Sequence, residues 1–443
     1  MLNALFSMTL WLFILVKSSP TKTHVLKEKT NRGFLSNKMI SYQRRADRLT
    51  PHKVIFSIAQ LNMEELKKVL ENVSDPFSAD YGKHWSKQKV AEFTSNPEGR
   101  SAVHALLKTK KEIIVERETI YGEFIFATAP VHIWEEMFAT TFHEYQINDR
   151  KNNSRRIIRA EEYSLPLELV AHISSVFNSV QFHGISIRPT ARKTSSSEIV
   201  GDGVIISDYV TPALINQVYS ISDNTGSMQI KQAVYESEYE DYSPSDLTFF
   251  QSSFGLPLQA VSEDINGHNY TCYYLGDCGE GNLDIQYIMG VAQNVYTIYD
   301  YSYDDSLDWM LSWITSVANS TDPADVYSIS YSQAELALSS SYTESFDVEA
   351  IKLGVMGTTI VAASGDDGAA SSLARDDSYY CGYIPQFPAS SPYVVAVGAT
   401  NVSHPIIQVN TPFSIHLFIR APNRVHPKWL ANLKQATTKP ETS

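Results

Sequence analysis

Two carboxylates lie four residues apart in the segment GEGNLDIQYIMGVAQ (residues 279–293), where apolar residues recur at helical spacing. Glu280 and Asp284 therefore share one face of the expected helix. Two carboxylates at this spacing repel each other when both are ionised, which raises one pKa and lets the pair share a proton in acid. Such a pair suits a general base held by a partner acid, although two exposed helix acids without a chemical role would leave the same pattern.

A second pair of acids lies in the sequence SGDDG, where an expected strand runs into a glycine-rich turn. The turn presents Asp366 and Asp367 at the edge of the sheet. One of them, kept neutral, could donate a hydrogen bond to a developing oxyanion. Taken alone, the same residues also suit an ordinary Asx/Gly turn.

The elements around these acids predict an α/β unit. Strands are expected over residues 325–332, 358–363 and 393–397, and a helix over 343–355 ends near Gly357. Strand–helix–strand order with short links indicates a doubly wound parallel sheet. Sites on such sheets are built beyond the carboxyl ends of the strands, where SGDDG lies.

The first half of the chain has a different order of elements. A strand at residues 52–58 precedes a helix that Asn62 and Glu65 are expected to start as a capping box. A hairpin around Gly122 and a helix near residues 132–138 follow. This βαββα order predicts a small α+β plait of the split-βαβ kind.

Charge divides the chain at the same place. Residues 18–199 carry 27 Lys and Arg against 21 Asp and Glu, whereas residues 200–398 carry 3 against 27. An acidic second unit disfavours nucleic acid as a partner and loses its self-repulsion in acid. We expect the basic first unit to dock on the acidic second unit, and acid to weaken that attraction.

The N-terminus and the cysteines indicate the secretory route. The apolar stretch of residues 2–16 has the length of a signal h-region, although no Lys or Arg precedes it and a retained anchor stays possible. Cys272 and Cys278 enclose a short loop and could form a disulfide, which leaves Cys381 over. N-glycosylation sequons begin at Asn72, Asn152, Asn269, Asn319 and Asn401.

Several motifs together resemble the sedolisins, the serine-carboxyl peptidases that include the tripeptidyl-peptidases and kumamolisin. The motifs are FSADYGKHWS (residues 77–86), TPALINQVY (211–219), EGNLDIQY (280–287), SGDDG (364–368) and FPASSPYVVAVGAT (387–400). By that resemblance Glu280 is the base for a serine hydroxyl, Asp284 orients it, and Asp366 lines the oxyanion hole. The implied fold is subtilisin-like. Only one histidine, His268, lies in residues 200–398, which disfavours a Ser-His-Asp mechanism.

The sequence departs from the family beyond about residue 401. The G-T-S turn that carries the nucleophilic serine and the calcium site near the family's C-terminus have no counterpart in this chain. The resemblance therefore indicates a C-terminally truncated precursor without its nucleophile, metal site or cofactor. The alternative is a non-catalytic product that acts as a propeptide-type inhibitor or binding protein.

The expected organisation follows from these observations. It comprises a signal peptide (residues 1–19), an activation propeptide (20–185), a cleavable linker (186–205), the N-terminal part of a catalytic domain (206–400) and an atypical tail (401–443). Expected partners are peptides or unfolded proteins and the chain's own propeptide, with no nucleic acid and no membrane after signal cleavage. The expected location is extracellular or lysosomal, with activity best near about pH 3–5.

Overall fold

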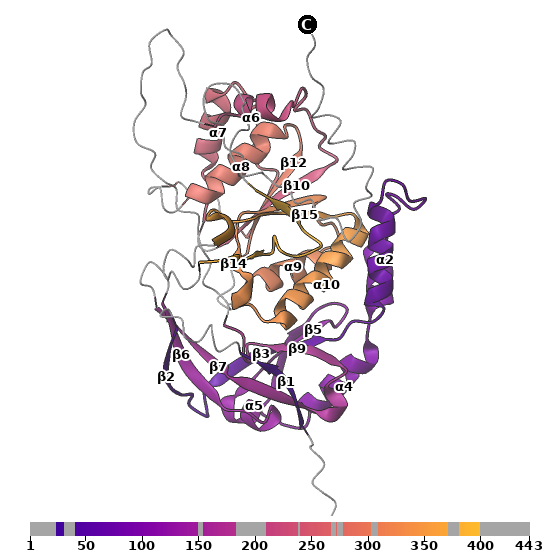
Figure 1. Cartoon of the computed structure of the whole chain (residues 1–443), viewed down its shortest axis with the longest axis vertical. Helices are drawn as coiled ribbons and strands as arrows, with labels where there is room; N and C mark the ends of the chain where they lie inside the picture. The colour runs from indigo at the N-terminus through magenta and orange to yellow at the C-terminus, as the bar shows by residue number, and fades with distance from the viewer. Residues whose placement is uncertain are drawn as a thin grey trace, which may run out of the picture.

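The computed structural model of the chain describes residues 24–30, 40–148, 154–182, 210–237, 240–266, 272, 278–302, 309–370 and 381–398. They form two units that lie one above the other in Figure 1, the N-terminal unit (residues 24–182) and the C-terminal unit (residues 210–398). The leader at 1–19, the linker at 186–205 and the tail at 401–443 lie outside the described residues, so their predicted roles remain predictions.

The N-terminal unit is built on an antiparallel sheet in the order β4-β5-β3-β9. Because β3 and β4 are separated by β5, this is the strand order of a split βαβ unit. The strands are β3 (Pro51–Ile58), β4 (Ile114–Glu118), β5 (Phe124–Pro130) and β9 (Ile173–Phe177), and the helices are α2 (Met63–Ser74), α3 (Lys87–Thr94), α4 (Pro97–Leu107) and α5 (Val131–Met137). Smaller sheets join β2 (Ile40–Arg45), β6 (Phe142–Asn148) and β7 (Ser154–Ala160), and β1 (His24–Lys29) with β8 (Glu162–Pro166).

Both faces of this sheet are apolar. Along β3, Val54 and Phe56 are fully buried in a core that also holds Trp134 of α5. Ile55, on the opposite face, belongs instead to a core shared with the C-terminal unit. Successive side chains of a strand point to opposite faces, so one face packs on the unit's own helices and the other docks on its partner.

The C-terminal unit is an α/β structure around a six-stranded sheet in the order β11-β12-β10-β13-β15-β17, with every pair of neighbours parallel. Helices α7 and α8 pack on one face, and α9 and α10 pack on the other. The strands are β10 (Lys231–Glu236), β11 (Glu263–Ile265), β12 (Tyr296–Tyr301), β13 (Val326–Ile329), β15 (Thr359–Ala363) and β17 (Val395–Val397). The helices are α6 (Pro212–Tyr219), α7 (Pro244–Ser253), α8 (Gly279–Val291), α9 (Trp309–Asn319) and α10 (Ser340–Met356).

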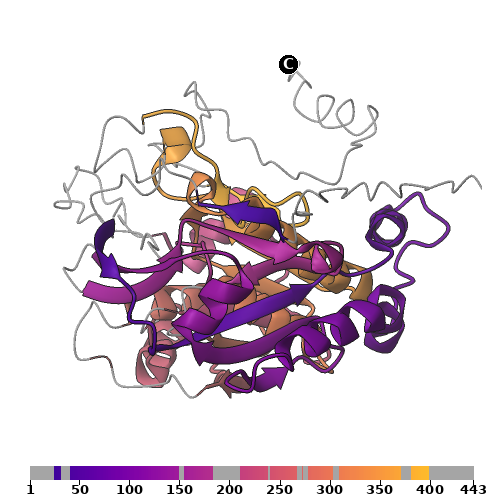
Figure 2. The same cartoon turned by 90° about the horizontal axis from the view of Figure 1, so that it is seen from below.

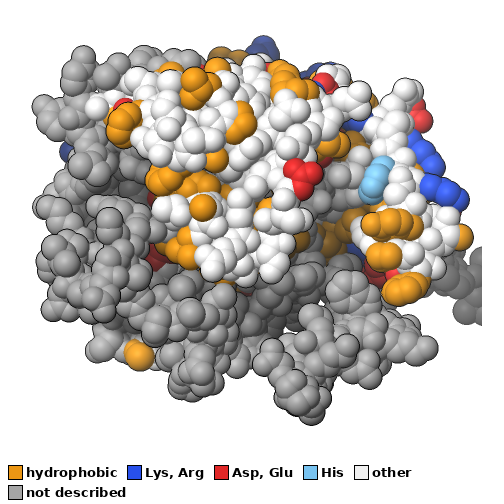
Figure 3. All heavy atoms as spheres, turned by 90° about the horizontal axis from the view of Figure 1, so that it is seen from above, with side chains coloured by type: hydrophobic (Ala, Val, Ile, Leu, Met, Phe, Trp, Pro, Cys, Tyr) orange, Lys and Arg blue, Asp and Glu red, His pale blue; other side chains and the backbone are white. Residues whose placement is uncertain are grey.

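The short pair β14 (Gln333–Ala334) and β16 (Gln386–Phe387) lies outside the main sheet. None of the helices in the described ranges reaches the length and apolarity that a bilayer crossing needs. Figure 3 shows the end of the molecule that carries α6 and α7, where the visible Lys and Arg side chains lie at the margins of the face. That distribution agrees with the scarcity of cations in residues 200–398.

Most expected elements are found, within a few residues of their expected bounds. The strand, helix and strand around Gly357 are β13, α10 and β15, and Gly357 ends α10 at φ +104°, a conformation that favours glycine. The prediction that Asn62 and Glu65 form a capping box was wrong. Asn62 is left-handed (φ 58°), caps no helix amide and donates its side-chain amide to the Phe93 carbonyl. Tertiary contact with α3 thus replaces the local cap.

The two units meet along α10. Viewed from below (Figure 2), the sheets of the N-terminal unit lie across the C-terminal unit. Leu66 and Leu70 of α2 pack against Ile351 and Val355 of α10. The backbone amide of Trp85 also donates to the Val355 carbonyl at 3.0 Å. A long helix held between a sheet face and α2 makes this a packed interface.

Candidate active site

The acidic residues of interest lie where parallel strands end. The register pairs Tyr235 with Ile329 and Ile329 with Ala362, so β10, β13 and β15 finish side by side. Glu236 is the last residue of β10, Ser330 follows β13, and Asp366 lies in the turn after β15. Polar side chains from three strands therefore gather at one edge of the sheet.

Helix α8 brings two further carboxylates to this edge. Ile285 and Met289 are buried against the sheet, which directs the Glu280 and Asp284 positions toward the strand ends. At Gly281 a Cβ atom would lie 2.4 Å from the Asp241 carbonyl oxygen, so only glycine lets the first turn come this close.

A disulfide fixes the start of the same helix. It joins Cys272 to Cys278, the residue before α8, with the two Cα atoms 5.8 Å apart. Cys381 is free and exposed. The bond therefore ties the chain before α8 to the turn that carries Glu280.

Asp284 is held at the centre of the cluster. Ser330 donates its hydroxyl to Asp284 Oδ2 at 2.6 Å. Burial raises the pKa of Asp284 to about 6, against the opposing hydrogen bonds from Ser330 and Glu236. A bond between two carboxyls needs one proton, and burial together with the Asp284 charge raises the pKa of Glu236 well above its usual range. Of the two buried carboxyls, Glu236 is therefore the one that more strongly favours its protonated form.

Glu280 has the most perturbed pKa among the residues predicted for the site. Burial, then the charges of Asp284, Glu240 and Asp366, raise its pKa to about 8, while a hydrogen bond with Ser330 opposes the rise. The Asp366 charge is among the causes of the Glu280 shift, so the SGDDG turn lies within electrostatic reach of the start of α8. The structure thus brings together Glu280, Asp284 and Asp366.

The SGDDG turn presents its carboxylate to solvent. Asp366 is exposed and Asp367 is partly buried. Gly365 (φ +95°) and Gly368 (φ +59°) take left-handed conformations that side chains disfavour. The two glycines let the chain turn tightly beyond β15, so Asp366 projects from the edge of the sheet.

Sequence reasoning missed Glu236, Glu240 and Tyr331. Glu236 is fully buried and accepts a hydrogen bond from the Tyr331 hydroxyl at 2.7 Å. Glu240 is buried and its Oε2 accepts from the Glu280 backbone amide at 3.4 Å. The available signal was the acidic run ESEYED, which begins at the last residue of a strand whose neighbours carry the other site residues.

Other predicted sites are placed less fully. Asn72 is exposed on α2, whereas Asn319 is half-buried and its side-chain amide donates to the Thr315 carbonyl at 2.9 Å. The sequons at Asn152, Asn269 and Asn401 lie outside the described residues. Across the described ranges, no group of three or more His, Cys, Asp or Glu side chains could hold a metal ion. Glycosylation therefore stays a prediction, with Asn72 the more accessible of the two described sites.

Comparison with known proteins places the motifs in a family. Residues 38–182 match the family described as "Pro-kumamolisin, activation domain". Tripeptidyl-peptidase 1 of Macaca fascicularis is 28% identical over 383 residues, which cover 83% of this chain and 64% of the relative. The Dictyostelium discoideum enzyme is 27% identical, with 86% of this chain and 68% of the relative covered. The chain thus spans about two thirds of the length of these curated relatives.

Among solved structures, Pseudomonas sedolisin, a serine-carboxyl proteinase complexed with pseudo-iodotyrostatin, is 20% identical over 44% of this chain and 55% of its own. Its TM-score of 0.35 is too low to carry an argument about the fold. The activation-domain match and the tripeptidyl-peptidase relatives agree with the motifs that line the acidic cluster. The activation-domain match over residues 38–182 and the similarity to the tripeptidyl-peptidase relatives over 83% of the chain together support a sedolisin-family precursor.

Proposed function

We propose that this chain is the zymogen part of an acid-active serine-carboxyl peptidase, of the tripeptidyl-peptidase or endopeptidase kind. Its substrates would be peptides or unfolded proteins. The observation that carries the proposal is the convergence of Glu280, Asp284 and Asp366 at the carboxyl edge of the sheet. The relatives named tripeptidyl-peptidase 1 support the same reaction class.

Glu280 is the proposed general base. It lies in the first turn of α8, only partly buried, where the hydroxyl of the enzyme's nucleophilic serine could reach it. The charge of Asp284 raises the pKa of Glu280 and so makes it a stronger base, and the Ser330 hydroxyl donates a hydrogen bond to Asp284. When Glu280 takes the serine proton, the hydroxyl oxygen attacks the scissile carbonyl, and the proton is later given to the leaving amine.

Asp366 is the proposed oxyanion donor. Asp366 lies in the exposed turn beyond β15, where a substrate carbonyl oxygen could approach it. A carboxyl can donate a hydrogen bond only while it is protonated, and negative charge developing on the oxygen strengthens that bond.

The pH profile follows from the two roles. With pKa values of about 8 and 6, Glu280 and Asp284 are mostly protonated in acid before substrate binds. A serine hydroxyl that donates to Glu280 favours the ionised form and lowers that pKa. We expect the rate to rise with pH as the pair of Glu280 and Asp284 loses its proton.

The proposed nucleophile is the serine of the family's G-T-S turn, which has no counterpart in residues 1–443. We therefore assign hydrolysis to a polypeptide that continues the subtilisin-like sheet beyond β17 and adds that turn. The calcium site would belong to the same added segment. The disulfide at Cys272–Cys278 fits an oxidising compartment, in agreement with a secreted or lysosomal enzyme.

The test joins residues 1–398 to the C-terminal segment of a relative that carries the G-T-S turn. The chimera is expected to hydrolyse an unfolded peptide between about pH 3 and 8, and Glu280→Gln is expected to abolish the reaction. Glu263→Gln is the matched control, because Glu263 is an exposed acid of the same sheet that accepts only from the Tyr296 hydroxyl among the described contacts. Equal rates for both variants would refute the assignment of Glu280.

A second candidate function is inhibition of a related intact enzyme. It is favoured by the N-terminal unit, which has its own core around Phe56 and Trp134 and a second apolar face around Ile55. We expect the 443-residue chain to lower the activity of an active relative in a dose-dependent manner. Unchanged activity at micromolar excess would exclude this role.

A further inference from the structure

A charged cluster is buried in the interface between the two units. Lys352 of α10 contacts Glu123 of the N-terminal unit at 3.1 Å and Glu349 of its own helix at 2.8 Å. The three side chains are 4%, 6% and 0% exposed. Gln60 of the N-terminal unit donates to the other oxygen of Glu349 at 2.8 Å. Two carboxylates thus share one cation away from solvent.

In this contact the cation comes from the acidic unit and the anion from the basic unit, which is the reverse of what composition predicts. The sequence predicts a basic N-terminal unit docked on an acidic partner. Instead, Lys352, one of only three Lys and Arg in residues 200–398, reaches from the acidic unit to a carboxylate of the basic one. Surface charge is screened by water and salt, whereas a buried pair depends on its own partners, so composition does not determine this contact.

The charges around the cluster are few. Lys87 of α3 acts on Glu123 and Lys352 from the edge of the interface, and its ammonium donates to the Asn319 carbonyl. Elsewhere on α10, Glu344 acts on Lys27 and Asp347 acts on Lys67. His84 lies beyond the end of the helix, against Gly357. Within the described residues, the second carboxylate therefore has no buried cation of its own.

The two carboxyls respond to this imbalance in opposite directions. Burial acts to raise the pKa of Glu123, but the Lys352 charge and the Thr119 hydrogen bond outweigh it and hold that pKa low. Burial also raises the pKa of Glu349, and there the attraction of Lys352 does not cancel it. Glu349 is thus the first to take a proton as the pH falls, and Glu123 the last.

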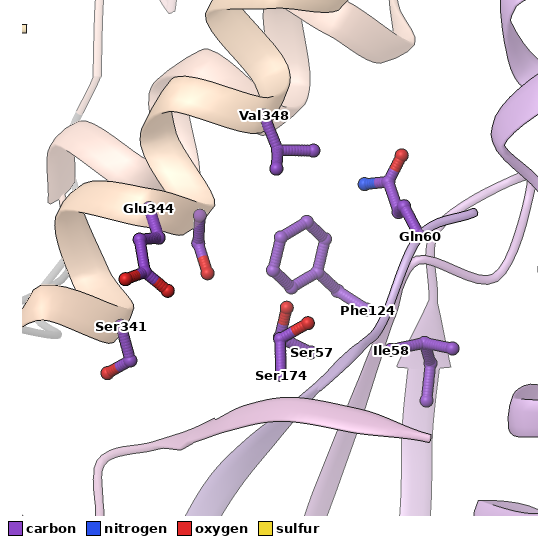
Figure 4. Close-up of a pocket in the computed structure, with 9 residues that line it drawn as sticks. Ser57, Ile58, Gln60, Phe124, Ser174, Ser341, Glu344 and Val348 are labelled. Carbon is purple, nitrogen blue, oxygen red and sulfur yellow. The ribbon is translucent and has the colours of Figure 1, made fainter. Parts of the chain in front are cut away.

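A cavity lies beside the cluster at the interface. A cavity of about 100 Å³ lies between the sheet of the N-terminal unit and α10, and Gln60, which donates to Glu349, lines it. Figure 4 shows Ser341 and Glu344 of α10 facing Ser57 and Ser174 of the sheet across this space. Gln60 therefore links this cavity to the buried cluster.

We propose that Glu123, Lys352 and Glu349 form a pH-dependent latch whose docked state holds one extra proton, so that the units are held together most firmly in mild acid and separate in stronger acid. Protonation of Glu349 leaves a neutral pair of Lys352 and Glu123. Protonation of Glu123 then removes the ion pair that joins Lys352 to the N-terminal unit. That the N-terminal unit restrains an enzyme rests on the proposed function, whereas the latch belongs to the docked chain.

The sign of each contribution follows from linkage. Docking raises the pKa of Glu349 above its value in the separated units. Its contribution to docking is therefore fully present below the pKa of the separated units, and it is lost as the pH rises through the pKa of the docked chain. Docking lowers the pKa of Glu123 below its value in the separated units. Its contribution to docking is therefore fully present above the pKa of the separated units, and it is lost as the pH falls through the pKa of the docked chain. The docked state is therefore most stable at a pH between these two limits.

The test measures hydrogen exchange at the Trp85 amide, whose bond to the Val355 carbonyl crosses the interface. In the full chain, the protection factor is expected to pass through a maximum in mild acid. Glu349→Gln mimics the protonated form and should raise the pH 7 value severalfold. Glu123→Gln should lower the maximum by roughly a hundredfold or more, because Lys352 loses its partner. No catalysis is needed, so failure of the proposed function leaves this result interpretable.

Two controls complete the experiment. Glu116→Gln removes a half-exposed acid of β4 that pairs with Lys53 outside the interface, and is expected to leave Trp85 unchanged. The Val234 amide in central β10 reports whether a variant opens the C-terminal unit itself. A Trp85 protection factor that only decreases as the pH is lowered from 7 would refute the latch. So would a Trp85 protection factor at pH 7 that Glu349→Gln leaves unchanged while Val234 stays protected.

Discussion

Replacing Asp284 by asparagine should stabilise the protein at neutral pH while it removes a proposed catalytic group. The pKa of Asp284 is about 6 in the folded chain, against an ordinary value of 3.8. A carboxyl whose pKa is raised on folding contributes stability below its unfolded pKa and loses it as the pH rises through the folded one. The difference of about two pH units, at about 1.36 kcal/mol each, corresponds to roughly 3 kcal/mol.

The asparagine side chain would resemble the protonated acid and can still accept from Ser330. We therefore expect Asp284→Asn to be about 3 kcal/mol more stable than the parent at pH 7, and within about 0.5 kcal/mol of it at pH 3.5. The measurement is the opening free energy at the Val234 amide, from hydrogen exchange in the full chain. Glu263→Gln, an exposed acid, should change neither value. A destabilisation of the same size at both pH values would refute this reasoning.

Three further outcomes are expected around α8. Gly281→Ala should lower the free energy of unfolding by about 1–3 kcal/mol and displace α8, because the added Cβ would lie 2.6 Å from the Tyr299 hydroxyl. Thermal unfolding measures this loss of stability. Ser330→Ala should raise the pKa of Asp284 by about one to two units through loss of a bond to the ionised carboxylate. Carboxyl NMR titration measures it, and an unchanged midpoint would contradict it. Cys278→Ser should cost about 2 kcal/mol, and no change in urea midpoint would argue against a role of the disulfide in holding α8.

The elements of the structure were largely predictable because their signals are local. The hairpin around Gly122, at φ +77°, and the helix that Gly357 ends depend on residue types a few positions apart. The face shared by Glu280 and Asp284 likewise follows from helical periodicity. The cap expected at Asn62 failed because the side chain found a partner on α3, which is distant in sequence.

The sequence by itself determined which residue types were present and which side of their own element they occupy. Only the tertiary structure decided what faces them. The six-stranded order brought the ends of β10, β13 and β15 together, and so added Glu236 and Ser330 to the acidic pair. It also placed Lys352 beside Glu123, 229 residues away in the chain. A pKa, a buried ion pair and a docked face depend on neighbours in space, and the spacing of residues along a chain carries no information on those neighbours.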